Sequence, residues 1–398
     1  AVHNENFFRD LSNYRMEWAL MKDGKSVQSG SVDNLNLEPQ QTANITLPLN
    51  IPSDGEVMLN VDFKTKSAEP LIAEGQTVAY EQIALNEATP VSYVENSTTE
   101  KVKIQNKKND PTITIASAKT TVAFDKATGL LCQYSVGGKS MLGEGGTLKP
   151  NFWRAVTDND MGAGLQNRLK AWHNPKMTLT GISVEKIKES KGTAATVTAS
   201  YDMPDVKAKL SLTYEVYGDG TIDVKQAMTK ATPDAKAPNL LRFGMVMDLP
   251  YDMDKSQWYG RGPIENYSDR KLSERIGLYS LTADQQYFPY IRPQECGTKS
   301  DIRWWKQSNA EGVGINIQPV NSWMCTGALH YNIADLDEGM EKAQRHSPEV
   351  PKSKFTELTF DLVQQGLGGT NSWGDLPLEK YRVPFGDMTF HFVIMPMK

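Results

Sequence analysis

Apolar and polar side chains alternate along many short stretches of this chain, which is the pattern of β-strands that bury one face. The clearest example is a pair of alternating runs, 206–216 and 222–228, separated by Gly218-Asp219-Gly220. Glycines accept the positive φ angles of a tight turn, so we predict a β-hairpin here. The same alternation predicts further strands at 14–20, 55–63, 195–201, 242–249 and 388–395, and on either side of the turn cluster 124–130.

Helical patterns are few by comparison. Apolar residues at the first, fifth and eighth positions of 165–172 predict about two helical turns. A second short helix is predicted to start at Asp335 or Asp337, either of which would cap it, and to run toward His346. Because strands dominate, we predict an all-β protein built from antiparallel sandwiches, the usual solution for many short strands.

A polar segment marks one domain boundary. The patterned region ends at Asn86–Pro90, and the stretch that follows, up to Pro111, is rich in Lys and Asn. The region before it has the size of an immunoglobulin-like sandwich, about 100 residues. We therefore predict an immunoglobulin-like β-sandwich over 1–90, a linker over 91–112 and one large β domain over 113–398, where no further break is visible.

Composition narrows the class of function. The chain has 398 residues, a formal net charge of −5 and 39% hydrophobic residues, enough to bury a core. The mild, mixed charge argues against a nucleic-acid partner, and no stretch approaches the roughly twenty apolar residues of a membrane span. The chain starts Ala-Val-His, with neither an initiator Met nor an apolar leader. We expect a soluble, mature or excised piece whose compartment, cytoplasm or periplasm, stays open.

The loop 366–374, Gly-Leu-Gly-Gly-Thr-Asn-Ser-Trp-Gly, carries the strongest functional signal. Its glycines can adopt backbone conformations that other residues rarely adopt, and they let the backbone come close to a neighbouring group. No apolar periodicity runs through the segment. A large indole presented from such a loop suits stacking on the apolar face of a sugar. The alternative is that Trp373 plugs the end of a β-sandwich, since aromatic side chains are usually buried. Composition leaves both interpretations open.

Oxygen-bearing side chains cluster at Asp158-Asn159-Asp160-Met161-Gly162. The segment lacks the twelve-residue ligand pattern of an EF-hand, and Asp and Asn also initiate turns through their own side chains. We predict a structural turn without a metal. The functional alternative is a mobile loop beside a pocket, hinged near Gly162 and Gly164.

A second group of charged residues resembles a carboxylate pair with an arginine. Since buried charges need partners, we predict instead a structural ion-pair network; its members are Glu265, Asp269, Glu295, Asp301 and Arg303. An aldose epimerase would need a general acid and a base on opposite faces of a sugar, typically His and Glu. The candidate histidines show no motif and are expected to be structural; they are His173, His330, His346 and His391.

Four ordered segments together resemble the C-terminal part of a glycoside hydrolase family 2 β-galactosidase. Segment 152–162 resembles an Arg-Ala-x-x-Asp-Asn-Asp-x-Gly block, and 258–270 a Gly-Pro-x-Glu-x-Tyr-x-Asp-Arg block. Segment 290–304 resembles a Tyr-x-x-Pro-Gln-Glu-x-Gly…Arg block, and 366–374 a Gly-Gly-x-x-Ser-Trp loop. Residues 6–14 and 78–82 are similar to the start and end of the sandwich that follows the catalytic barrel in this family. The resemblance thus covers essentially the whole chain.

The resemblance implies a five-domain enzyme of which this chain is the fourth and fifth domain, the last being an antiparallel super-sandwich of galactose-mutarotase type. It implies retaining hydrolysis of terminal β-D-galactosides by two carboxylates of an upstream TIM barrel. No alternating β/α pattern of such a barrel is visible here, so we expect no catalytic residue in this chain and no hydrolysis by it alone. The resemblance also implies magnesium and a monovalent cation in the barrel, with no cofactor in this chain, and homo-oligomers of the full-length enzyme.

Residue by residue, the resemblance makes Trp373 one wall of the sugar pocket at the mouth of the barrel. Asn371, Asp160 and the loop at Gly162 are lesser candidates on the sugar side. The family often carries acidic residues where this chain has Thr370 and Asn371, which puts a charge-based role there in doubt. Two rival functions stay open: an independent carbohydrate-binding module that uses the concave face of the super-sandwich, and an aldose epimerase.

Overall fold

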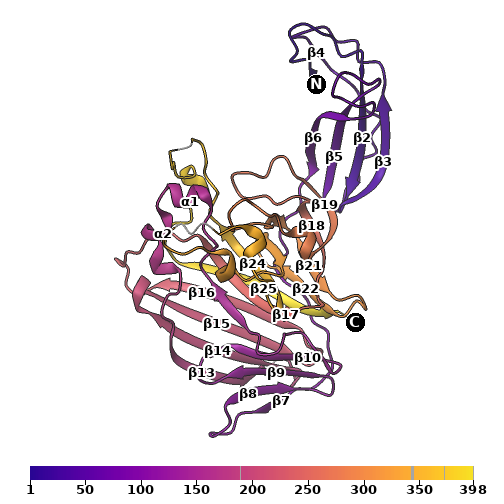
Figure 1. Cartoon of the computed structure of the whole chain (residues 1–398). Helices are drawn as coiled ribbons and strands as arrows, with labels where there is room; N and C mark the ends of the chain where they lie inside the picture. The colour runs from indigo at the N-terminus through magenta and orange to yellow at the C-terminus, as the bar shows by residue number, and fades with distance from the viewer. Residues whose placement is uncertain (189, 342–344, 372, 398) are drawn as a thin grey trace. The chain divides into compact units, whose positions relative to one another are not determined.

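The computed structural model describes residues 1–188, 190–341, 345–371 and 373–397. Its regular secondary structure is mostly β-strand, and the chain divides into two compact units, Ala1–Thr89 and Pro90–Lys398 (Figure 1). The all-β class predicted from the sequence is confirmed. None of the helices over the described residues has the length and apolar character that a membrane crossing requires.

The first unit is a small sandwich. Its larger sheet has the order β3-β2-β5-β6, and β1 pairs with β4 in a second, two-stranded sheet; the bounds are β1 Val2–His3, β2 Tyr14–Lys22, β3 Lys25–Val32, β4 Thr42–Ala43, β5 Val57–Thr65 and β6 Thr77–Asn86. The alternation seen in the sequence places Met16, Trp18 and Leu20 of β2 on the buried face. Asp23 and Gly24, both at positive φ, make the turn between β2 and β3.

The second unit consists of two large antiparallel sheets. Over the described residues, one holds ten strands, in the order β20-β23-β24-β17-β12-β10-β9-β8-β7 with β11 beside β10; their bounds are β7 Lys103–Gln105, β8 Thr112–Ala116, β9 Thr120–Asp125, β10 Leu131–Val136, β11 Lys139–Ser140, β12 Leu148–Asn151, β17 Arg242–Pro250, β20 Lys299–Ile302, β23 Met324–Leu329 and β24 Phe355–Gln364. The other, again over the described residues, holds nine, in the order β13-β14-β15-β16-β25-β22-β21-β18-β19; their bounds are β13 Thr178–Lys186, β14 Ala194–Met203, β15 Ala208–Tyr217, β16 Ile222–Lys230, β18 Lys255–Gly262, β19 Arg275–Thr282, β21 Trp304–Ser308, β22 Gly314–Pro319 and β25 Met388–Met397.

The two large sheets pack face to face. Phe360 of β24 meets Phe392 of β25 edge-on, with ring centroids 4.9 Å apart, and Phe124 of β9 meets Tyr214 of β15 at 4.8 Å. One continuous apolar core includes residues of both sheets. This is the antiparallel super-sandwich predicted for the larger domain.

The predicted hairpin is confirmed as β15 and β16, paired from Ala208↔Lys230 to Val216↔Ile222. The turn requires glycine at two positions for different structural reasons. Gly220 has a φ of +96°, which a side chain would strain. Gly218 is not at positive φ, but a Cβ there would lie 2.1 Å from the backbone oxygen of Glu100. The pair on either side of 124–130 is likewise confirmed, as β9 and β10.

The helices are short, and one differs from expectation. The pattern over 165–172 is confirmed as α2, Leu165–Arg168, followed by the 3₁₀ turn Lys170–Trp172. The second predicted helix is wrong in its start: α4 spans only Ile333–Leu336, with Asn332 as its N-cap and Asp337 at its C-cap. Residues 342–344 of that prediction lie outside the described residues. The remaining α-helices over the described residues are α1, Asp158–Gly162, and α3, Ala283–Gln286.

The segment 91–112, expected as a linker, falls within the second unit. It contributes β7, which pairs with β8 from Lys103↔Ala116 to Gln105↔Thr114. The backbone N–H of Asn321 also donates to the oxygen of Val91. The polar composition of this segment therefore coexists with strand pairing at the edge of the ten-stranded sheet.

Strand β17 has two buried faces with different chemistry. Phe243, Met245, Met247 and Leu249 point into the apolar core. The alternate positions, among them Arg242 and Asp248, point away from that core and are still buried. The outer face of the ten-stranded sheet is therefore covered, and it carries polar and charged groups.

Candidate functional site

Trp373 stands on the surface of the second unit. Its residue is 89% exposed, so the indole does not plug the end of the sandwich. The side chain of Asn371 holds the backbone around Trp373. Its oxygen accepts from the N–H of Trp373 at 2.8 Å, and its amide nitrogen donates to the carboxylate of Asp375. Asn371 therefore acts within the loop as a turn-forming residue. Ser372 lies outside the described residues.

The start of the loop is held by Asp269. Its two carboxylate oxygens accept from the backbone N–H groups of Leu367 and Gly368, at 2.9 and 2.8 Å. Gly366 leaves room for this contact, because a Cβ there would lie 2.5 Å from Cγ of Asp269. Two segments that the sequence analysis picked out separately, 258–270 and 366–374, thus meet here.

Arg154 ties the same loop to helix α1. The guanidinium is fully buried and forms a two-pronged ion pair with Asp160, with Nε–Oδ2 at 3.0 Å and Nη2–Oδ1 at 2.8 Å. It also donates to the backbone oxygens of Gln365 and Gly366. Burial is the largest single effect and lowers the pKa of Arg154, but the charge and hydrogen bond of Asp160, together with Glu295 and Tyr267, raise it above its usual value. A charged, bidentate contact of this kind fixes the loop against α1.

Asp160 has structural contacts, and its expected place on the sugar side stays a prediction. Besides Arg154, its carboxylate accepts from the N–H of Thr157, and the Thr157 hydroxyl accepts from the N–H of Asp160, which forms a capping box. The Asp158–Asp160 segment is therefore a capped helical turn. The described residues contain no group of three or more acidic, His or Cys side chains that could hold a metal ion.

Helix α1 packs against both limbs of the loop (Figure 1, yellow beside α1). A Cβ at Gly374 would lie 2.2 Å from the oxygen of Gly162, and one at Gly369 would lie 2.7 Å from the side chain of Asn159. Both Gly369 and Gly374 have positive φ. Gly162 thus lies beside the residue that follows Trp373, and α1 is the backing on which the loop rests.

The remaining charged candidates are spread over separate contacts. Glu265 accepts from the N–H of Gly297 at 2.8 Å and pairs with Arg270 at 2.7 Å. Asp301 pairs with Arg261 at 2.6 Å and with Lys271 at 2.8 Å.

Arg303 and Glu295 complete this set. The guanidinium carbon of Arg303 lies 4.3 Å from the ring centroid of Trp323. Glu295 accepts from Thr298 and lies 3.4 Å from the buried Arg242, which also meets Asp361 at 3.1 Å. Burial raises the pKa of Asp361 to about 7 although Arg242 lowers it. These carboxylates brace loops and strands, and none of the contacts described places two of them as a catalytic pair around Trp373.

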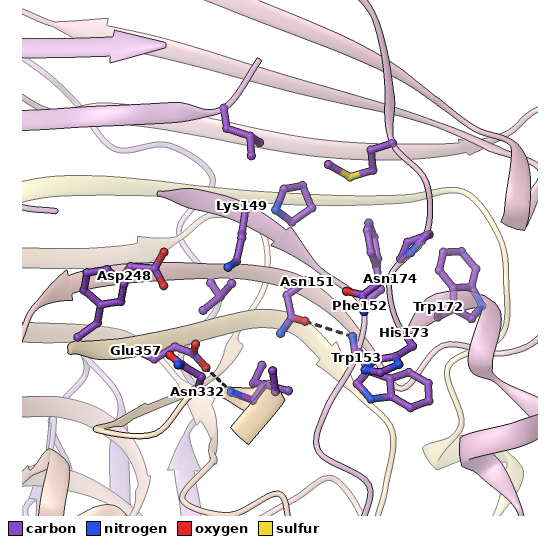
Figure 2. Close-up of a pocket in the computed structure, with 18 residues that line it drawn as sticks. Lys149, Asn151, Phe152, Trp153, Trp172, His173, Asn174, Asp248, Asn332 and Glu357 are labelled. Carbon is purple, nitrogen blue, oxygen red and sulfur yellow. Dashed lines mark hydrogen bonds between the residues drawn. The ribbon is translucent and has the colours of Figure 1, made fainter. Parts of the chain in front are cut away.

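A pocket of about 560 Å³ opens on the outer face of the ten-stranded sheet (Figure 2). Polar groups from three strands line it: Lys149 and Asn151 of β12, Asp248 of β17 and Glu357 of β24. Sequence analysis missed these residues, because the three strands are far apart along the chain. The sequence shows only that polar residues occupy strand positions on the face opposite the apolar core, which does not by itself indicate a pocket.

Of the four histidines considered as epimerase candidates, His173 is the one that lines this pocket. Its Nε2 lies 3.4 Å from the carboxylate of Asp337. The other three have protein partners elsewhere: His330 contacts Asp284 and the oxygen of Tyr251, His346 contacts the oxygen of Ile291, and His391 contacts Asp223.

Comparison with known proteins identifies both units. A family model described as β-galactosidase small chain matches residues 116–394, and a model described as β-galactosidase domain 4 matches residues 1–86. Among curated proteins, a β-galactosidase from Priestia megaterium is 30% identical over 378 residues, which is 94% of this chain and 35% of that protein. A β-galactosidase from Halalkalibacterium halodurans is 25% identical over 98% of this chain and 38% of its own length. The chain thus spans little more than a third of these relatives.

Solved structures with similar backbones are more distant. A galactose 1-epimerase from Lactobacillus acidophilus aligns at 8% identity with a TM-score of 0.40, over 75% of this chain and 98% of its own. A GH36 α-galactosidase from Geobacillus stearothermophilus aligns at 7% identity with a TM-score of 0.41, over 74% of this chain and 41% of its own.

Proposed function

Because this chain belongs to the β-galactosidase small chain family, we propose that it is the C-terminal accessory region of a retaining β-galactosidase that hydrolyses terminal β-D-galactosides. In this proposal the chain supplies scaffold and one wall of the sugar pocket. The two carboxylates that perform the chemistry belong to the remaining part of the enzyme, which the relatives carry and this chain does not span.

The observation that carries this proposal is the exposed indole of Trp373 on an anchored loop. Aromatic rings are usually buried, so an exposed one held in a fixed backbone setting favours contact with a ligand. Asp269 and Arg154 hold the start of the loop, and Gly374 rests on α1 immediately after the indole. Because the loop is already anchored, less conformational entropy is lost when a sugar ring stacks on the indole.

The carboxylates around the loop are consistent with a supporting role. Retaining glycosidases place an acid and a nucleophile about 5–5.5 Å apart, free to reach the glycosidic bond. Here Asp160 is engaged by Arg154 and Thr157, and Asp269 by two backbone N–H groups. We therefore expect the isolated chain to release no nitrophenol from a nitrophenyl β-galactoside.

The test is Trp373→Ala in the β-galactosidase that contains this chain. Loss of one stacking contact of about 1–2 kcal/mol predicts a roughly five- to thirty-fold fall in kcat/KM, carried mainly by a higher KM. Trp373→Phe should lose less, since it retains an aromatic face. Leu272→Ala, at another strongly exposed apolar residue, serves as the matched control and should leave both constants unchanged. Unchanged kcat and KM in Trp373→Ala would refute the proposal.

A further inference from the structure

The pocket on the outer face of the ten-stranded sheet is independent of the loop that carries Trp373. Its floor is formed by adjacent strands, β12, β17 and β24, and its sides by the segment 172–177 and the start of α4. None of the described residues that line it belongs to 366–374. Its volume of about 560 Å³ lies in the range of small-molecule sites.

Two carboxylates stand side by side on the floor. Asp248 and Glu357 are directly opposite each other on the antiparallel strands β17 and β24. One oxygen of Asp248 accepts from Thr147, and one oxygen of Glu357 accepts from the N–H of Ile333 at 2.9 Å. Among the described residues no donor reaches the second oxygen of either carboxylate. Each therefore retains an acceptor position on the pocket side (Figure 2).

Donors stand beside these acceptors. Lys149 is exposed, and its ammonium end points into the same space as the Asp248 carboxylate (Figure 2). Asn151 is 9% exposed; its oxygen accepts from the N–H of Trp153, whereas no protein partner reaches its buried Nδ2 among the described residues. A buried donor without a partner costs free energy until a ligand or water meets it.

Apolar surface completes the lining. The ring of His173 lies against that of Trp153, with centroids 4.9 Å apart, and Phe355 and Met177 face the pocket from other segments. Flat and apolar faces next to a few convergent polar groups are typical of ligand sites.

The charge pattern selects the ligand class. Two carboxylates disfavour an anion, while Lys149 disfavours a cation, and no metal-ligand group of three or more acidic, His or Cys side chains occurs among the described residues. A sugar hydroxyl both donates and accepts, so adjacent hydroxyls can bridge a carboxylate and a neighbouring amide or ammonium. Burial and the Asp248 charge raise the pKa of Glu357 to about 7, which lets this carboxyl also donate near neutral pH.

We propose that this pocket is a second carbohydrate site, which binds one neutral pyranose unit through Asp248, Glu357, Lys149 and Asn151. The ring's C–H face rests on the apolar surface of Trp153 and His173, whose rings lie side by side next to Asn151. The site goes beyond the function proposed above, since it requires neither Trp373 nor the rest of a β-galactosidase.

The test is isothermal titration of the 398-residue chain with galactose, glucose and lactose at pH 7. We expect millimolar binding of at least one of these sugars. Lys149→Met should weaken it at least fivefold, and Ala334→Trp, at an exposed residue of the pocket lining, should abolish it. Both positions are exposed, so both variants should fold; circular dichroism and thermal midpoints verify this. Lys209→Met, at an exposed lysine of β15, is the matched control and should bind normally.

Trp373→Ala separates this site from the loop. Binding that survives Trp373→Ala and is lost in Ala334→Trp supports the pocket. Binding that survives Ala334→Trp, or that is lost in Trp373→Ala, overturns the proposal and assigns the sugar elsewhere. No heat with any of the three sugars at tens of millimolar overturns it as well, and leaves the role of Trp373 in the complete enzyme unaffected.

Discussion

The buried carboxyl of Glu357 makes the stability of the second unit depend on pH. Burial is the largest cause that raises its pKa, from 4.5 to about 7, and the Asp248 charge adds to it, whereas the hydrogen bond from Ile333 opposes it. The folded protein therefore holds this proton more tightly than the unfolded chain. The resulting stabilisation is fully present below about pH 4.5 and is lost as the pH rises through about 7.

Glu357→Gln isolates this effect. The amide is neutral at every pH, and its oxygen can still accept from the N–H of Ile333. At about 1.4 kcal/mol per tenfold change in proton affinity, the shift from 4.5 to about 7 amounts to about 3 kcal/mol. The variant should match the wild type near pH 4.5 and exceed it by about 3 kcal/mol near pH 8.

The assay is urea unfolding of the wild type and the variant at several pH values between these limits, with the difference in unfolding free energy plotted against pH. Burial also brings the pKa of Asp361 up to about 7 and that of Lys299 down to about 7, but both groups are present in both proteins and should largely cancel in the difference. Glu144→Gln, at an exposed glutamate, controls for the loss of a charge. A difference between Glu357→Gln and wild type that does not change with pH would refute the reasoning.

Two further predictions concern the anchors of the Trp373 loop. Asp269→Ala removes the acceptor of two backbone N–H groups, so amide hydrogen exchange at Leu367 and Gly368 should become at least about tenfold faster, with a loss of about 1–3 kcal/mol in stability; exchange as slow as in wild type would contradict the anchoring role. Arg154→Met leaves Asp160 buried without its partner and should cost about 3–5 kcal/mol in urea unfolding, whereas Arg168→Met, at an exposed arginine, should cost little. Equal effects of the two arginine substitutions would count against a buried ion pair.

The strands could be read from the sequence where one face meets the core and the other meets water. In β15 and β16 this alternation is complete, so the hairpin was predicted with its turn. The helix predicted from Asp335 or Asp337 failed because its start is set by a distant contact. The N–H of Ile333, the first helical residue, donates to Glu357, a residue of β24. Local capping rules carry no information about such a partner.

For the candidate site too, the segments could be predicted from the sequence but the contacts between them could not. The segments 152–162, 258–270 and 366–374 could be singled out because their residue order resembles a family pattern. Their mutual contacts could not, since Arg154 reaches backbone oxygens, which any sequence provides. The polar lining of the pocket was also missed, because it arises only when β12, β17 and β24 become neighbours in one sheet.

The place of β25 has a consequence for the order of folding. This strand lies between β16 and β22, so among the described strands the two halves of the nine-stranded sheet join through Met388–Met397 alone. Until this stretch has left the ribosome, β16 and β22 each have an unpaired edge. Such edges can pair with the wrong strand or with another chain. The second unit can therefore close only after the sequences of all the other described strands of this sheet have emerged.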